Sequence, residues 1–186
     1  YCFKTPAQQM RELLAKRQVQ LSELVQPLPG SLPRDNYRPV SVSRHSDGHT
    51  LLDALCHAVK PLPPEYWETE SRLGNVLNGV RAPAALTRTV HAGERYLHRL
   101  VQQVEPDVSF ALNFLHEDEA LVVLNKPAPL PMHAGGRYLR NTLQFVLEEL
   151  YRPQKPRPAH RLDANTSGVV IVARTQTANP VQAQAN

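Results

Sequence analysis

Cysteine is scarce in this chain of 186 residues, which contains only Cys2 and Cys56. Two cysteines this far apart form neither a CxxC pair nor a disulfide framework, so we expect reduced thiols and a cytoplasmic location. Long hydrophobic runs are missing as well. The longest, such as residues 168–173, fall far short of the ~20 residues that a membrane-spanning helix needs. These absences argue against a disulfide-stapled domain and against a membrane partner.

Charge is nearly balanced, with a mild basic excess. Lys and Arg number 21 against 17 acidic residues, which gives a net charge of +4 and a pI near 9.3. This excess permits an anionic partner such as RNA, although many enzymes without such a partner share it. Hydrophobic residues make up 41% of the chain, so we expect a folded protein with one ordinary domain or two small ones.

The first segment, residues 1–48, is expected to form a helix and a Pro-rich linker. Thr5 is a good N-cap, Pro6 suits the first helical position, and Gln8 completes a capping box. Apolar residues at helical spacing as far as Leu24 form one face, which we expect to dock onto the rest of the protein. Residues 26–39 are rich in proline and favour a linker, and residues 40–43 favour a short strand.

The second segment, residues 49–106, predicts a small helix-hairpin unit. Thr50 can cap a helix over residues 51–59. Asn78-Gly79 is a hairpin turn signal between residues 75–77 and 80–82, and Ala92-Gly93 is a second turn before another strand.

The third segment, residues 107–186, predicts two buried strands at residues 120–124 and 168–173, because both runs are short and apolar. Between them we expect a turn-rich loop, a helix over residues 142–150, and an irregular loop over residues 151–158. Residues 176–186 have almost nothing apolar and are expected to fray. The expected fold class is therefore α+β.

The most informative stretch is His160 to Thr175, HRLDANTSGVVIVART. Arg161 and Asp163 stand two residues apart on a loop that leads into a buried strand. A side chain on such a loop is held in place by the rigid sheet and can still contact a substrate. On charge and spacing alone, the commoner explanation is a surface ion pair between Arg161 and Asp163 at a turn capped by Thr166.

HRLDANTSG, followed by an apolar strand and Ala-Arg, resembles the HRLDxxTSG signature of the RluA-type RNA pseudouridine synthases. The stretch VVLNKPAPLPMHAGGRY resembles the strand and NKPxGLxxH loop of that family, and residues 141–143 match its NTL helix start. The three motifs run in the right order from about residue 112 to residue 175. The resemblance implies that residues 107–186 are the first part of a mixed-sheet pseudouridine synthase catalytic domain.

The resemblance makes Asp163 the catalytic residue. Isomerisation of uridine breaks the N1–C1′ bond, turns the uracil and joins C5 to C1′. A carboxylate either traps cationic character at C1′ or removes a sugar proton, and the sequence does not choose between these routes. By resemblance, Arg161 fills the space that the everted uridine vacates or pairs with phosphate. No cofactor and no metal are expected, because none of the eight histidines shows a convincing ligand spacing.

Residues 49–106 resemble an S4-type RNA-binding module through GNVLNGVRAP and TVHAGERYLHR. Leu77 and Glu94 depart from that pattern, which has Val and Asp there. Arg81 and Arg88 are expected on a basic face for RNA. The other interpretation of this segment is a purely structural subdomain.

Several further residues are candidates for RNA contact. The resemblance places Lys126 near the active-site cleft, but a solvated lysine after a strand is the commoner meaning. His160 is expected to brace its loop rather than act as an acid or base, and His133 either touches an RNA phosphate or is a scattered surface charge. The expected RNA-contacting set is Arg161, His160, Lys126, Thr166, Arg81 and Arg88.

The leading hypothesis is a monomeric RNA pseudouridine synthase that acts on structured rRNA or tRNA. The alternatives are a non-catalytic RNA-binding fragment with an incomplete active site and an interaction protein with no RNA role. Nothing after Thr175 matches the family's later motifs, a base-stacking tyrosine and a basic residue that contacts the aspartate. We therefore expect a chain truncated at its C-terminus, with little or no turnover of its own.

Overall fold

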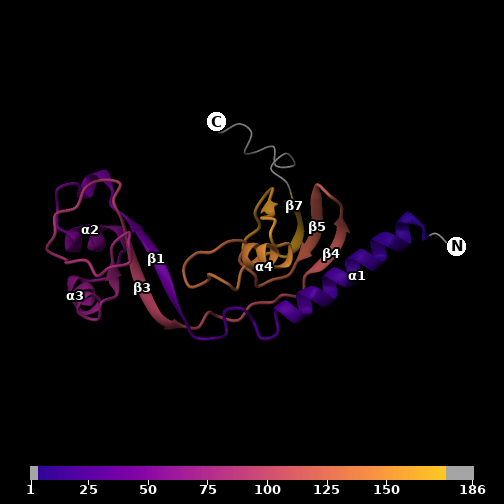
Figure 1. The fold of residues 1–186 in the computed structure, drawn as a ribbon, viewed down its shortest axis with the longest axis horizontal. Coiled ribbons are helices and arrows are strands. Elements are labelled where there is room, and N and C mark those ends of the chain that lie inside the picture. The colour runs from indigo at the N-terminus through magenta and orange to yellow at the C-terminus, as the bar shows by residue number, and fades with distance from the viewer. Residues whose placement is uncertain (1–3, 175–186) are drawn as a thin grey trace. The chain divides into compact units, whose positions relative to one another are not determined.

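The computed structural model describes residues 4–174, which form two compact units (Figure 1). One unit combines the residues up to Leu32 with those from Val104 onward, and the other is Pro33–Gln103. The expected boundaries at residues 49 and 107 differ from this division, because the N-terminal helix and the C-terminal segment share one core. The expected frayed tail at residues 176–186 lies outside the described residues. Between residues 4 and 174, no helix is both long enough and apolar enough to cross a membrane.

The unit Pro33–Gln103 contains a three-stranded antiparallel sheet in the order β1-β3-β2. Two helices pack on it around Trp67, which is fully buried. The elements are β1 (Arg34–Ser41), a short 3-10 helix (Arg44–Ser46), α2 (Leu51–Ala58), α3 (Pro64–Arg72), β2 (Val76–Leu77) and β3 (Arg95–Gln103). The predicted helix after Thr50 is confirmed as α2, and the Thr50 hydroxyl accepts a hydrogen bond from the Asp53 N–H.

One expectation for this unit is wrong and another is confirmed only in part. The expected linker contains β1, which pairs with β3 from Arg34 to Ser41. Its Pro39 is tolerated because β1 is an edge strand, where a missing N–H breaks no ladder on the open side. The predicted hairpin turn at Asn78-Gly79 forms, but the chain pairs again only at Pro83. The turn is longer than expected because Asn78 Oδ1 accepts the N–H groups of Val80 and Ala82.

The other unit contains a four-stranded antiparallel sheet in the order β4-β5-β7-β6. Val122, Leu124, Val170 and Val172 point into a core that α4 and α1 help to close. The elements are α1 (Pro6–Leu24), β4 (Asn113–Glu117), β5 (Leu121–Lys126), α4 (Leu143–Leu150), β6 (Arg157–Pro158) and β7 (Gly168–Ala173). The α+β class is confirmed, as are the predicted strand at residues 168–173 and the helix that Thr142 caps.

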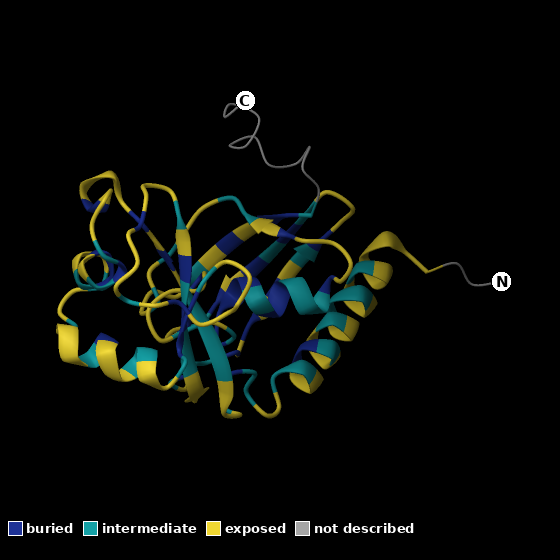
Figure 2. Ribbon diagram, turned by 60° about the vertical axis from the view of Figure 1, so that its left-hand side comes forward, coloured by how far each residue is buried: buried dark blue, intermediate teal, exposed yellow. Residues whose placement is uncertain are grey.

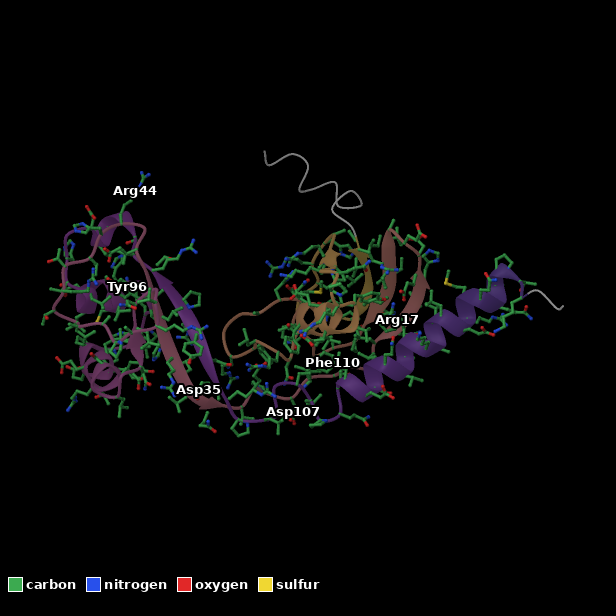
Figure 3. All side chains as sticks on the ribbon, in the orientation of Figure 1. Arg17, Asp35, Arg44, Tyr96, Asp107 and Phe110 are labelled. Atoms are coloured by element: carbon green, nitrogen blue, oxygen red, sulfur yellow. The ribbon has the colours of Figure 1, made fainter. Side chains whose placement is uncertain are left out.

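Helix α1 begins with the predicted Thr5–Gln8 capping box and docks as expected, burying Leu21 in the core. Most of its remaining length is exposed (Figure 2). Its Arg17 guanidinium forms an ion pair with the buried Glu117 of β4 at 2.8 Å (Figure 3). The hydroxyl of Tyr151 and the guanidinium of Arg174 also donate to Glu117. One buried carboxylate therefore ties α1, the sheet and the end of α4 together.

Candidate active site

The two loops that carry the sequence motifs meet at one edge of the four-stranded sheet. Strands β5 and β7 are antiparallel neighbours, and their register pairs Lys126 with Gly168. The loop that follows β5 therefore begins next to the point where the loop that precedes β7 ends. A direct hydrogen bond joins the two loops, from the Leu130 N–H to the Ala164 carbonyl at 2.8 Å.

Asp163 is exposed on the loop that leads into β7. Its carbonyl accepts the Thr166 N–H at 3.1 Å, which closes a tight turn. On one side Leu162 packs against the core, and on the other Gly168 enters the strand. Gly168 has φ of +154°, and a Cβ there would lie 3.4 Å from Leu162 Cδ1. The backbone around Asp163 is thus fixed while its carboxylate stays open to solvent.

Lys126 is not the solvated lysine that its sequence position favoured, since its side chain is 0% exposed. Its ammonium donates to the carbonyls of Pro127 and Leu130, both at 2.9 Å, and more weakly to that of Ala164 at 3.4 Å. Burial lowers the pKa of this ammonium. Lys126 therefore holds the loop after β5 against the residue that follows Asp163.

His160 is hydrogen-bonded to the strand that follows its loop. The Ile171 N–H of β7 donates to His160 Nε2 at 3.2 Å, so this nitrogen must be the unprotonated one. Arg161 and Thr166 are both exposed. Among residues 4–174 no ion pair joins Arg161 to Asp163, so the structure does not support the surface ion pair.

The charges of two arginines, Arg161 and Arg157, act on His133. The pKa of His133, on the loop after β5, is lowered first by loss of solvent around the imidazole and then by the charges of Arg161 and Arg157. The imidazole is therefore biased toward its neutral form, and the two guanidiniums supply the cationic charge beside it. Arg157 also lies 3.4 Å from the Glu148 carboxylate, which offsets part of its charge.

Arg81 and Arg88 lie in the other unit, where aromatic rings hold both. The Arg81 guanidinium stacks over the Tyr37 ring at 4.7 Å. The Arg88 guanidinium lies 5.9 Å from the Tyr96 ring centroid and 3.8 Å from the Glu94 carboxylate.

A small pocket of about 200 Å³ opens beside Arg88. The Tyr96 hydroxyl donates to Glu94 at 2.6 Å (Figure 3). Burial and this carboxylate raise the pKa of Tyr96 to about 12. The lining residues come from the hairpin turn, from the segment that precedes β3 and from the start of β3, namely Asn78, Gly79, Arg88, Glu94, Arg95 and Tyr96.

Sequence reasoning missed the residues that act through buried polar contacts. Glu105 and Glu117 are both buried, and their hydrogen-bond partners lie more than 30 residues away in the chain. No local pattern marks such residues. Within the described part of the chain, no group of three His, Cys, Asp or Glu side chains is placed to hold a metal ion.

The sequence model of the RNA pseudouridylate synthase family matches residues 120–184, which include both motif loops and β5, α4 and β7. These residues belong to the RNA pseudouridylate synthase family. The predicted family is thereby confirmed, whereas the S4-like identity of residues 49–106 remains a prediction.

Relatives of this pseudouridylate synthase segment extend the similarity beyond the matched residues. Human pseudouridylate synthase RPUSD2 is 34% identical over 130 residues, 69% of this chain and 24% of its own length. The tRNA pseudouridine(31) synthase of Saccharomyces cerevisiae is 28% identical over 171 residues, 81% of this chain and 42% of its own. RNA pseudouridine synthase 7 of Arabidopsis thaliana is 28% identical over 135 residues, 72% of this chain and 34% of its own. The chain thus spans less than half the length of each.

Proposed function

We propose that this protein converts uridine to pseudouridine in structured RNA, rRNA or tRNA, with Asp163 as the catalytic residue. The supporting observation is the placement of Asp163. Its carboxylate is exposed on a backbone turn held by hydrogen bonds, at the sheet edge where the two family motifs meet. Residues 120–184 match the RNA pseudouridylate synthase family, and the proposed reaction is the one that gives this family its name.

The reaction is an isomerisation, so atoms balance within one nucleotide. The N1–C1′ bond breaks, the uracil turns, and a C5–C1′ bond forms. C5 gives up its hydrogen, and N1 gains a proton. Asp163 attacks C1′ or removes a sugar proton, and an exposed carboxylate serves either route. The uridine must first leave its stack, at a cost of a few kcal/mol.

Phosphate contacts around the everted nucleotide are assigned to Arg161, two residues before Asp163. Arg161 is exposed and its planar guanidinium suits phosphate or the vacated stack. Thr166 is exposed on the same turn. His160 and Lys126 act indirectly in this proposal, because both bind backbone groups of the site loops.

The unit Pro33–Gln103 supplies further RNA contacts in this proposal, as an S4-like module. Arg81 and Arg88 are exposed and preorganised by stacking on tyrosine rings, which lowers the entropy lost on binding. Replacing each arginine by Ala should weaken RNA binding and lower the slope of log affinity against log salt by about 1. Arg11→Ala, on the exposed side of α1, is the matched control. Equal salt slopes for all variants would refute this assignment.

A tritium-release assay tests the catalytic role. RNA with tritium at C5 of uridine loses the label to water when C5 joins C1′. Because little turnover is expected of this chain, the assay uses single-turnover conditions with protein in excess, and Asp163→Asn should abolish the tritium release that remains, as removal of a catalytic group does, while RNA affinity barely changes. Asp107→Asn, an exposed carboxylate of the same unit (Figure 3), should react at the original rate. RNA binding without any conversion by the unaltered protein would favour the non-catalytic alternative.

We further propose that the protein acts as a monomer in the cytoplasm. A single sedimenting species at the mass of one chain, unchanged by dilution, supports the monomer. A species of twice that mass would overturn it.

A further inference from the structure

Glu105 is a buried carboxylate that the proposed chemistry does not use. Its side chain is 3% exposed. Three successive backbone N–H groups donate to it, those of Leu139 at 2.9 Å, Arg140 at 2.9 Å and Asn141 at 2.7 Å. Convergent N–H groups of this kind form a nest for an anion, and here the protein's own carboxylate fills it.

Asn141 extends the contact to a third segment. Its side-chain oxygen accepts the Gly30 N–H at 2.8 Å, and its side-chain nitrogen donates to the Pro106 carbonyl at 2.9 Å. The Glu105 N–H donates to the Gly30 carbonyl at 2.9 Å. A Cβ at Gly30 would lie only 2.7 Å from Glu105 Cβ and 2.8 Å from Asn141 Cγ, so the close approach requires glycine.

This cluster stands at the end of the loop that follows β5. Thr142 comes directly after Asn141 and caps α4. The first helical N–H groups then return to the same loop, from Leu143 to the Pro131 carbonyl at 2.8 Å and from Gln144 to the Met132 carbonyl at 2.9 Å. The neighbouring Leu130 N–H holds Ala164, the residue after Asp163. Hydrogen bonds joined by short stretches of backbone thus lead from Glu105 to the turn that carries Asp163.

We propose that Glu105 is a positioning residue, which sets the loop of residues 127–142 and through it the Asp163 turn. Only the catalytic consequence rests on the proposed function. Glu105 and Gly30 also lie near the two points where the chain passes to and from Pro33–Gln103. Both covalent connections of that unit are therefore anchored to the segment that precedes α4. A cap serving α4 alone would need neither Gly30 nor the carbonyl of Pro106.

Amide hydrogen exchange of the 186-residue chain tests the positioning role. Glu105→Gln removes the charge and one acceptor oxygen, so the Leu139, Arg140 and Asn141 amides should exchange roughly ten- to a hundredfold faster. If Glu105 positions the site loop, the Leu130 and Thr166 amides should also exchange faster. Amides of β3, in the other unit, should keep their protection.

Gly30→Ala is a second variant, because it displaces the carboxylate without removing its charge. It should give the same pattern, and Glu105→Asp should restore part of the protection. Glu119→Gln, at an exposed carboxylate between β4 and β5, should change nothing. Faster exchange confined to residues 139–141 would overturn the proposal, and so would uniform loss of protection across the unit, which is the signature of a merely stabilising residue.

Tritium release by the same variants separates this inference from the proposed function. With an active protein, Glu105→Gln should lower the single-turnover rate at least tenfold, while RNA affinity stays within about twofold of the original. Faster exchange at Leu130 and Thr166 without any conversion by the unaltered protein would sustain the positioning role and refute the catalytic function. An unchanged rate in an active protein would refute the catalytic consequence of positioning.

Discussion

Replacement of Lys126 by Met is the perturbation whose magnitude follows most directly from the structure. Methionine fills nearly the same volume and keeps the side chain unbranched, so the core stays packed. It removes an ammonium that donates to the carbonyls of Pro127, Leu130 and Ala164. The link between the loop after β5 and the Asp163 turn then depends on the Leu130 N–H alone.

The expected loss of stability is about 3 kcal/mol. Two of the three hydrogen bonds are short, and each bond to a charged donor contributes about 1.5–3 kcal/mol. The weaker contact at 3.4 Å adds little. Burying an ammonium costs free energy, and the same burial lowers the pKa of Lys126. Methionine avoids this cost, which offsets part of the stability lost with the hydrogen bonds.

Urea unfolding of the chain measures this loss. The transition is followed with a spectroscopic probe placed in the unit that contains Lys126. Lys155→Met is the matched control, because Lys155 is exposed on the loop before β6. It should change the free energy of unfolding by no more than about 0.5 kcal/mol. A Lys126→Met variant as stable as the control would show that the bonds from the ammonium to the Pro127 and Leu130 carbonyls do not stabilise the fold.

Three more perturbations have defined outcomes. Glu117→Ala removes the shared partner of two arginines and a tyrosine, and should cost about 3–5 kcal/mol in urea unfolding. Gly168→Ala places a Cβ at φ of +154° beside Leu162, and should lower stability by about 1–3 kcal/mol in the same assay. The pKa of Asp118 is lowered to about 2, chiefly by His116, from an ordinary 3.8. Its ionised form therefore stabilises the fold above about pH 4, and that contribution is lost as the pH falls to about 2. Asp118→Asn should remove this part of the acid dependence in unfolding measured against pH.

Each of these has a control of the same chemical type. Glu119→Ala and Asp107→Asn remove exposed carboxylates, and neither should change stability or its pH dependence measurably. Gly79→Ala adds a Cβ in open space and should be tolerated. Equal effects of a variant and its control would contradict the structural reason given for that variant.

Local signals account for the elements that the sequence predicts well. The capping box at Thr5 and the cap at Thr142 satisfy backbone N–H groups within a single turn, so they are visible in four consecutive letters. The strand Gly168–Ala173 is a short β-branched run, and its bounds agree with the prediction. In each case the nearest residues in the chain decide the structure.

The features that the sequence did not predict depend on residues that are distant in the chain. Strand β1 depends on pairing with β3, more than 50 residues away, and its proline content concealed it. The burial of Lys126 follows from two loops that supply carbonyls, and nothing in the letters NKP indicates that. The motif identifies Asp163 as a candidate. Its position next to the loop after β5, however, follows from the register of β5 and β7.

The role of Asp163 is best tested by a crystal structure of the protein with the Asp163→Asn substitution, bound to an RNA that contains the target uridine. We expect an everted uridine whose C1′ lies about 3–3.5 Å from the side chain at position 163, as a reacting pair requires. A uridine that stays stacked, or a sugar bound elsewhere on the protein with position 163 facing away from it, would show that Asp163 is not the catalytic residue.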